Sequence, residues 1–182
     1  MTIESSSEPD AFAEFDAVIC AYGIMHMPNP EKALAEMRRV LRTGGRIAVS
    51  VWQAPAADNG FGLLYHAIQA HGVADVDLPH GPDFFQFGSQ ERLASALSGT
   101  GFAGIAVEPL AQYWVFSEVD EFIACFVDAT VRSRGLLAAQ NDAARGAIFD
   151  AVRSGMQAFR SEDGYRVPMP ALIGSGVANG DA

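Results

Sequence analysis

The sequence is poor in cysteine and in basic residues, and it contains no long apolar run. Both cysteines, Cys20 and Cys125, lie in apolar surroundings, which favours buried free thiols over a disulfide framework. Lysine and arginine together number 12 against 22 acidic residues, for a formal net charge of −10. Because nucleic-acid binding needs clustered Lys and Arg, a nucleic-acid partner is not expected.

No apolar run approaches the roughly 18 residues that a membrane-spanning helix needs. The start of the chain is acidic and rich in serine, and it lacks the basic region of a signal peptide. These two features predict a cytoplasmic protein without a membrane partner.

What the sequence does contain is typical of a globular α/β protein. Of the 182 residues, 49% are hydrophobic and 19% are charged, which allows a substantial core. Residues 1–13 are polar and lack periodicity, so we expect a flexible tail there. We expect residues 14–182 to form one domain, with helical insertions at about 55–99 and 117–164.

The first structured stretch predicts a strand, a crossover helix and a second strand. Asp16–Tyr22 is apolar on both faces, as a central parallel strand would be. Asn29-Pro30 is a favourable helix start, and Gly44-Gly45 is the expected helix stop. A second buried strand is expected over Arg46–Trp52, completing a right-handed βαβ unit.

Further elements follow this unit. We expect helices over 61–72, over 89–99, after a Ser117 cap and after Asn141, and strands at about 105–116 and 169–177.

The segment Phe15–Trp52, with the sequence FDAVICAYGIMHMPNPEKALAEMRRVLRTGGRIAVSVW, resembles a known family. It is similar to the fourth- and fifth-strand region of class I S-adenosylmethionine-dependent methyltransferases, of the small-molecule type related to quinone-biosynthesis enzymes. Weaker similarity continues through Gly101-Phe102 to the last predicted strand. The resemblance implies a partial Rossmann-like sheet of about four strands with flanking helices, in the spatial order first, second, last and third by chain position.

In that family, a glycine-rich turn and an acidic residue that binds the ribose precede the segment that Phe15 begins. The resemblance therefore implies that this chain corresponds to the C-terminal half of a methyltransferase domain, without the N-terminal cofactor-binding half. Gly60-Phe61-Gly62 and Gly174-Ser175-Gly176 are poor substitutes, because neither provides a strand, a tight turn and a helix start in sequence.

The cofactor implied by the resemblance is S-adenosylmethionine. The end of the family's fourth strand lies under the methionine and methyl part of the cofactor, so Cys20, Ala21 and Tyr22 match by position. Two missing charged hydrogen bonds would cost about 3–6 kcal/mol, so we expect weak or absent cofactor binding by this chain alone.

His26 follows the same strand end and is the candidate catalytic residue. An imidazole can accept a proton from the acceptor as the methyl group arrives. The alternative is a structural histidine that packs under the loop, since many members of the family transfer methyl groups by proximity and desolvation.

Apolar and aromatic side chains are the candidates for an acceptor pocket, with plain core packing as the alternative for many of them. The candidates are Met27, Trp52, Phe61, Tyr65, Phe84 and Phe85. No metal site is expected, because His66 and His71 are five residues apart and do not share a helix face.

Several functional hypotheses remain open at this point. The chain is a methyltransferase part that acts on a small apolar or aromatic acceptor once the missing half is supplied in trans. Alternatively, it is a non-catalytic binding or assembly module, or a truncated fragment without activity. The strand over Asp16–Tyr22 has an unprotected edge, which predicts a homodimer or pairing with a complementing half.

Overall fold

The computed structural model describes residues 14–79 and 81–179, which form two compact units. Within the described part of the chain, the first unit contains residues 14–51, 82–109 and 172–179. The second contains residues 52–79, 81 and 110–171. The predicted tail, 1–13, lies outside the described residues. No helix in the described ranges is long and apolar enough to span a bilayer.

A four-stranded sheet forms the first unit, in the order β1 (Phe15–Ala21), β2 (Leu41–Trp52), β7 (Ala171–Ala178) and β3 (Phe102–Leu110). The strands β1 and β2 are parallel, as the crossover requires. This order confirms the predicted sequence of first, second, last and third strand.

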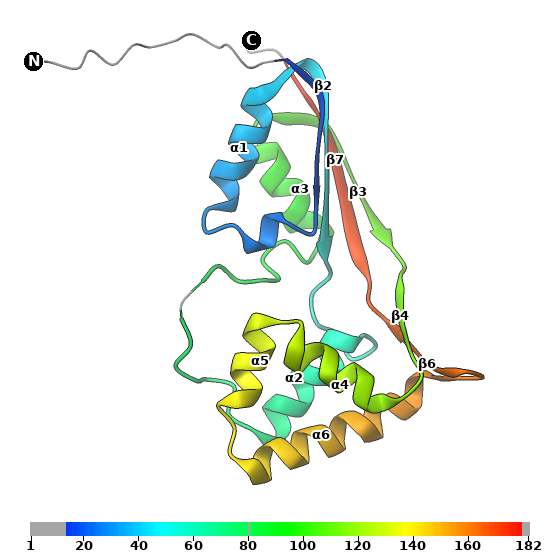
Figure 1. The fold of residues 1–182 in the computed structure, drawn as a ribbon. Coiled ribbons are helices and arrows are strands. Elements are labelled where there is room, and N and C mark those ends of the chain that lie inside the picture. The colour runs from blue at the N-terminus through cyan, green and yellow to red at the C-terminus, as the bar shows by residue number, and fades with distance from the viewer. Residues whose placement is uncertain (1–13, 80, 180–182) are drawn as a thin grey trace, which may run out of the picture. The chain divides into compact units, whose positions relative to one another are not determined.

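Helices α1 (Pro30–Val40) and α3 (Gln90–Gly99) pack on one face of this sheet (Figure 1). The Asn29 side chain caps α1 by accepting from the backbone N–H of Lys32 at 3.0 Å, as the sequence predicts. A Cβ atom at Gly174 would lie 2.9 Å from the Leu93 side chain, so α3 approaches β7 closely where the strand has glycine.

The two faces of β1 differ in burial. Residues paired across parallel strands point to the same face, and Cys20, opposite Val49, is buried on the helix-covered side. The opposite face carries Ala17, Ile19 and Ala21, all exposed, and the Ile19 side chain is 77% exposed. Asp16–Tyr22 was expected to be buried on both faces, but among the described residues β1 ends the sheet and one of its faces is open.

The prediction that Gly44-Gly45 ends the first helix is wrong. The helix ends at Val40 and β2 begins at once with Leu41. The register jumps from Phe15 opposite Leu41 to Ala17 opposite Arg46, so the glycines lie in a bulge inside the strand. Gly44 has a φ of 81°, a backbone conformation that favours glycine, and this explains why the pair occurs here.

The second unit is mainly helical. Its helices are α2 (Gly60–His71), α4 (Val119–Asp128), α5 (Val131–Ala138) and α6 (Asp142–Met156), the last followed by the short 3₁₀ turn η2 (Gln157–Phe159). The helix predicted after Asn141 is confirmed as α6, which buries Ile148, Val152 and Met156.

The start of α4 differs from its prediction. The cap is Glu118 rather than Ser117, and Glu121 closes a reciprocal capping box with it. The Glu121 carboxylate also accepts from the Ser117 N–H at 2.8 Å, so one acidic side chain satisfies two backbone donors.

A three-stranded antiparallel sheet completes the second unit, in the order β4 (Tyr113–Phe116), β6 (Gly164–Pro168) and β5 (Arg160–Ser161). The single strand predicted at about 105–116 is therefore two strands, β3 and β4, which belong to different sheets. Neither β5 and β6 nor helix α5 was predicted. The short hairpin carries too few apolar residues to give a periodic signal of its own.

Candidate functional site

The carboxyl end of β1 is held in an uncommon backbone conformation. Tyr22 has a φ of 50°, and it is the one non-glycine residue with positive φ in the described part of the chain. Its N–H donates to the carbonyl oxygen of Ser50 at 3.1 Å and to the Ser50 Oγ at 3.2 Å. Left-handed conformations of this kind cost on the order of 1 kcal/mol and cluster at functional sites.

A tight turn follows Tyr22. A Cβ atom at Gly23 would lie 3.0 Å from the Cys20 sulfur, which leaves little room for a larger residue. The 3₁₀ turn η1 (Ile24–His26) comes next, and Ile24 and Met25 are buried. These two side chains anchor the turn, while His26 remains exposed at its end.

The structure brings three of the predicted site residues together. The His26 ring meets the Phe84 ring edge-to-face, with centroids 5.3 Å apart. Phe84 in turn meets Phe85 at 4.9 Å and an interplanar angle of 88°. His26 and the phenylalanines lie far apart in the sequence but within the same unit, so an apolar and aromatic surface borders the imidazole.

The three predicted cofactor residues differ in orientation. The Cys20 side chain is buried on the helix-covered face of the sheet, whereas Ala21 is exposed on the other face and Tyr22 is half-buried. The Cys20 thiol is therefore not presented at the surface of this strand end. Met27, predicted for the acceptor pocket, is half-buried directly after η1.

The remaining predicted pocket residues belong to the second unit. Trp52 meets Phe61 edge-to-face at 5.5 Å and Trp114 at 5.8 Å, and Phe61 meets Phe126 at 5.8 Å. Phe61 is buried, so it fits the alternative of core packing better than a pocket wall. Tyr65 is half-buried in α2. No local pattern indicates that Trp114 joins this cluster, because it lies in β4 of the unpredicted sheet.

The two glycine pairs that were considered as substitutes for a cofactor-binding glycine turn have packing roles. A Cβ atom at Gly62 would lie 1.8 Å from the Ala56 carbonyl oxygen, and one at Gly60 would lie 2.5 Å from the Met169 sulfur. On β7, a Cβ atom at Gly176 would lie 3.1 Å from that of Phe102. Close approach of neighbouring groups therefore accounts for these glycines without a cofactor.

Metal and thiol chemistry find little support in the described ranges. There, no three His, Cys, Asp or Glu side chains are grouped as metal ligands would be. Burial raises the pKa of the Cys125 thiol, which keeps it protonated near neutral pH and makes it a poor nucleophile.

Comparison with known proteins connects this site to a family. Residues 2–49, which include β1, η1, α1 and the bulged start of β2, match the methyltransferase domain family. The chain is 33% identical over 106 residues to the demethylmenaquinone methyltransferase of Deinococcus radiodurans, a match that covers 52% of this chain and 42% of the relative. It is 45% identical over 49 residues to the ubiquinone/menaquinone biosynthesis C-methyltransferase UbiE of Ralstonia pickettii, covering 25% of this chain and 19% of the relative.

The matches therefore span less than half the length of these curated relatives. Among solved structures, a protein of Bacillus halodurans C-125 provisionally assigned as a methyltransferase is similar with a TM-score of 0.50. The two share 17% identity, and the similarity covers 93% of this chain and 72% of that one. The chain is thus methyltransferase-like, with the Rossmann-like α/β fold of class I S-adenosylmethionine-dependent methyltransferases and a segment that matches the methyltransferase domain family.

Proposed function

We propose that the chain provides the methyl-transfer side of an S-adenosylmethionine-dependent methyltransferase that acts on a small apolar or aromatic acceptor. The observation that carries the proposal is the Tyr22–His26 turn at the carboxyl end of β1. Ligands of open α/β sheets bind outside the carboxyl ends of the strands. This strand end also lies within the segment that matches the methyltransferase family.

The acceptor proposed is a quinol-type aromatic ring. Two relatives are named for demethylmenaquinone methylation and for ubiquinone and menaquinone biosynthesis, which supports this chemistry. The Phe84 and Phe85 rings beside His26 offer an apolar surface on which an aromatic acceptor can pack. His26 is proposed as the base that takes the proton released as the ring is methylated.

The rest of the cofactor site is proposed to come from a complementing polypeptide. In the described residues, no α-helix begins at a glycine turn directly after a strand, and close packing accounts for Gly60, Gly62 and Gly176. The edge of β1 offers unpaired backbone donors and acceptors in these ranges. A complementing half that pairs there would bring its own glycine turn and ribose-binding acid to the carboxyl end of β1.

Co-expression tests this proposal. The chain is produced together with the N-terminal half of the Deinococcus radiodurans relative, and transfer of tritiated methyl from S-adenosylmethionine to a short-chain demethylmenaquinol is measured. We expect methylated product from the pair and only background from either polypeptide alone. If the two polypeptides form a complex that binds S-adenosylhomocysteine but methylates no quinol, the proposed acceptor is wrong. A complex that binds neither cofactor nor acceptor would favour a non-catalytic assembly role.

A further inference from the structure

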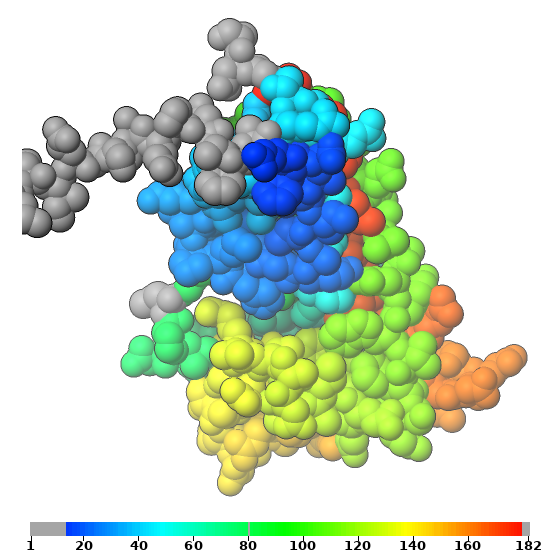
Figure 2. Space-filling model, turned by 45° about the horizontal axis from the view of Figure 1, so that its top comes forward, coloured from blue at the N-terminus to red at the C-terminus, as the bar shows by residue number. Residues whose placement is uncertain are grey.

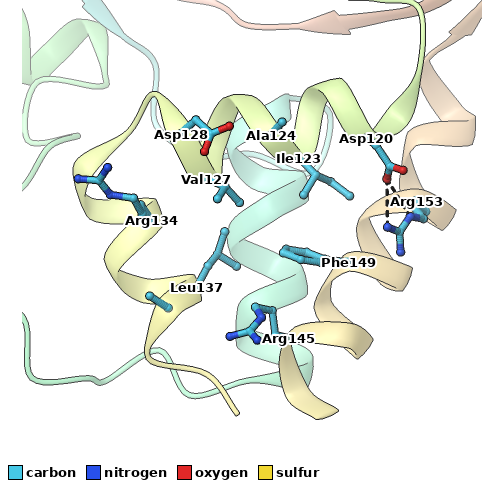
Figure 3. Close-up of a pocket in the computed structure, with 11 residues that line it drawn as sticks. Asp120, Ile123, Ala124, Val127, Asp128, Arg134, Leu137, Arg145, Phe149 and Arg153 are labelled. Atoms are coloured by element: carbon cyan, nitrogen blue, oxygen red, sulfur yellow. Dashed lines mark hydrogen bonds and ion pairs between the residues drawn. The ribbon is translucent and has the colours of Figure 1, made fainter. Parts of the chain in front are cut away.

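Helices α4, α5 and α6 of the second unit surround a groove with a volume of about 500 Å³ (Figure 3). The groove lies in the range of small-molecule sites. Apolar side chains of the three helices line it together with five charged residues, which are Asp120, Asp128, Arg134, Arg145 and Arg153. None of these residues belongs to the set predicted for methyl transfer.

The floor of the groove is apolar. Ile123 and Val127 project from α4, Leu137 from α5 and Phe149 from α6, and Figure 3 shows these side chains directed toward one another. Val127 and Phe149 are half-buried, so part of this apolar surface still faces solvent. Burying that surface under an apolar ligand is favourable by the hydrophobic effect.

The lining carries three arginines, and two of them are already paired. Arg153 bonds to Asp120 and to Asp150, each at 3.0 Å, and the hydrogen bond to Asp120 is the main cause of its raised pKa. Arg145 bonds to Asp142. These two guanidinium groups are therefore held in place rather than available to a ligand.

Arg134 is the cation that remains. In the described ranges, its guanidinium has neither a hydrogen bond nor an ion pair, and Figure 3 shows the exposed side chain extending outward from α5 at the edge of the groove. The carboxylate of Asp128, at the end of α4, likewise has no ion pair there. Asp120, Asp142 and Asp150 balance Arg145 and Arg153, so Arg134 and Asp128 are the lining charges left without a partner in the described ranges.

We propose that this groove binds an amphipathic carboxylate, such as a medium-chain fatty acid anion. The acyl chain lies on Ile123, Val127, Leu137 and Phe149, and the carboxylate accepts hydrogen bonds from Arg134. A planar guanidinium matches a carboxylate in two parallel hydrogen bonds, which fits a single anionic head group on an apolar body. Asp128 weakens this binding by repulsion, so neutralising it should strengthen the complex. Binding in this groove does not depend on methyl transfer.

Calorimetric titration with decanoate tests the head-group contact. We expect Arg134→Gln to weaken decanoate binding about fivefold, the scale of an exposed ion pair. Arg132→Gln is the matched control, because Arg132 lies on the same helix, is exposed and does not line the groove. The decanoate affinity of this control variant should equal that of the parent protein. Asp128→Asn should strengthen binding roughly twofold.

Decyltrimethylammonium serves as the cationic probe of the same chain length. It should bind more weakly than decanoate. Arg134→Gln should strengthen binding of this cation, and Asp128→Asn should weaken it. Tighter binding of the cation than of decanoate would overturn the proposal, as would equal decanoate affinities for the Arg134 and Arg132 variants.

A second pair of variants tests the location. Ala138 lines the groove and is exposed, so Ala138→Trp fills it without entering the core and should abolish decanoate binding. Ala143→Trp, at an exposed position of α6 outside the lining, should leave binding unchanged. Thermal unfolding confirms that both variants are folded. Unaltered binding by a folded Ala138→Trp protein would place the ligand elsewhere and refute the proposed groove.

Discussion

At the scale of single residues, the backbone of Tyr22 is the most specific feature of the site. Its positive φ is maintained by two hydrogen bonds to Ser50, which join the end of β1 to the neighbouring strand. This conformation lies at the point where the chain leaves β1 and enters η1, which ends at His26. A regular strand end would continue straight and would not form this turn.

Two isomeric substitutions test this conformation. A β-branched side chain is especially unfavourable at positive φ, so Tyr22→Ile should lower the free energy of unfolding by about 1 kcal/mol more than Tyr22→Leu. Both variants lose the same ring and hydroxyl, which leaves branching at Cβ as the difference. Urea denaturation measures the two values. Equal stabilities would mean that the positive φ of Tyr22 is not retained in solution.

The role of His26 is testable in the complemented enzyme. As a general base it should contribute roughly a hundredfold to the rate, so His26→Ala should reduce kcat far more than it weakens cofactor binding. His66→Ala is the control, since His66 is an exposed histidine of α2. If turnover by the His26 variant equals that of the control, His26 has only a structural role.

At the scale of secondary-structure elements, the bulge in β2 depends on close backbone contacts. A Cβ atom at Gly45 would lie 2.9 Å from the Arg42 carbonyl oxygen and 3.1 Å from that of Phe15. Asp16 and Arg42 form an ion pair of 2.5 Å beside the bulge. The bulge therefore fixes the register with which β1 joins β2.

Substitution of glycine by alanine should have opposite effects at two positions. Gly45→Ala is expected to destabilise the protein by about 1–2 kcal/mol, because the contacting atoms belong to the backbone and cannot move easily. Gly146→Ala, in an exposed turn of α6 with open space around it, should stabilise by about 0.5–1 kcal/mol. Thermal or urea unfolding measures both. A neutral Gly45 variant would show that the bulge adjusts without cost.

The edge of β1 is the second feature at this scale. The dark-blue start of the described chain lies at the surface of the first unit in Figure 2, and Phe15 and Ile19 are 55% and 77% exposed. An exposed apolar strand with open backbone groups favours pairing with another strand. We therefore expect self-association through β1, or pairing with a complementing half.

A lysine at the edge tests this expectation. Ile19→Lys should reduce self-association, because charged edge residues oppose strand pairing. Val131→Lys is the matched control, since Val131 is 81% exposed but lies on helix α5. Sedimentation at low micromolar concentration measures both variants and the parent protein. A monomeric parent protein at these concentrations would contradict the prediction, and so would equal loss of association in both variants.

At the scale of the whole molecule, the central question is whether the chain by itself holds the cofactor. Under the proposed function, a complementing half supplies the glycine turn and the ribose-binding acid, and each would contribute a charged hydrogen bond, together about 3–6 kcal/mol. This corresponds to a loss in affinity of roughly a hundred- to ten-thousandfold. We therefore expect titration calorimetry with S-adenosylmethionine to detect no micromolar binding by the chain alone. Micromolar affinity would mean that another segment replaces the glycine turn.

Much of the first unit could be predicted from local sequence. The Asn29-Pro30 helix start, the βαβ unit and the strand order follow from capping chemistry, hydrophobic periodicity and family resemblance, and the structure confirms them. The predicted site is only partly assembled by local sequence. Residues Cys20 to Met27 are neighbours in the chain, so their proximity requires no tertiary information.

Other features were decided by long-range contacts that a local pattern does not contain. The glycine pair resembles a helix stop, but the pairing of Phe15 with Leu41 draws the chain into a strand before the glycines occur. The contact of His26 with Phe84, and the convergence of α4, α5 and α6 on one groove, join residues widely separated in sequence. Capping and periodicity act over one or two turns of chain, so the sequence by itself determined where most elements begin and which faces are apolar. Packing acts between distant segments, and for that reason only the tertiary structure decided which of those faces meet and which side chains they bring together.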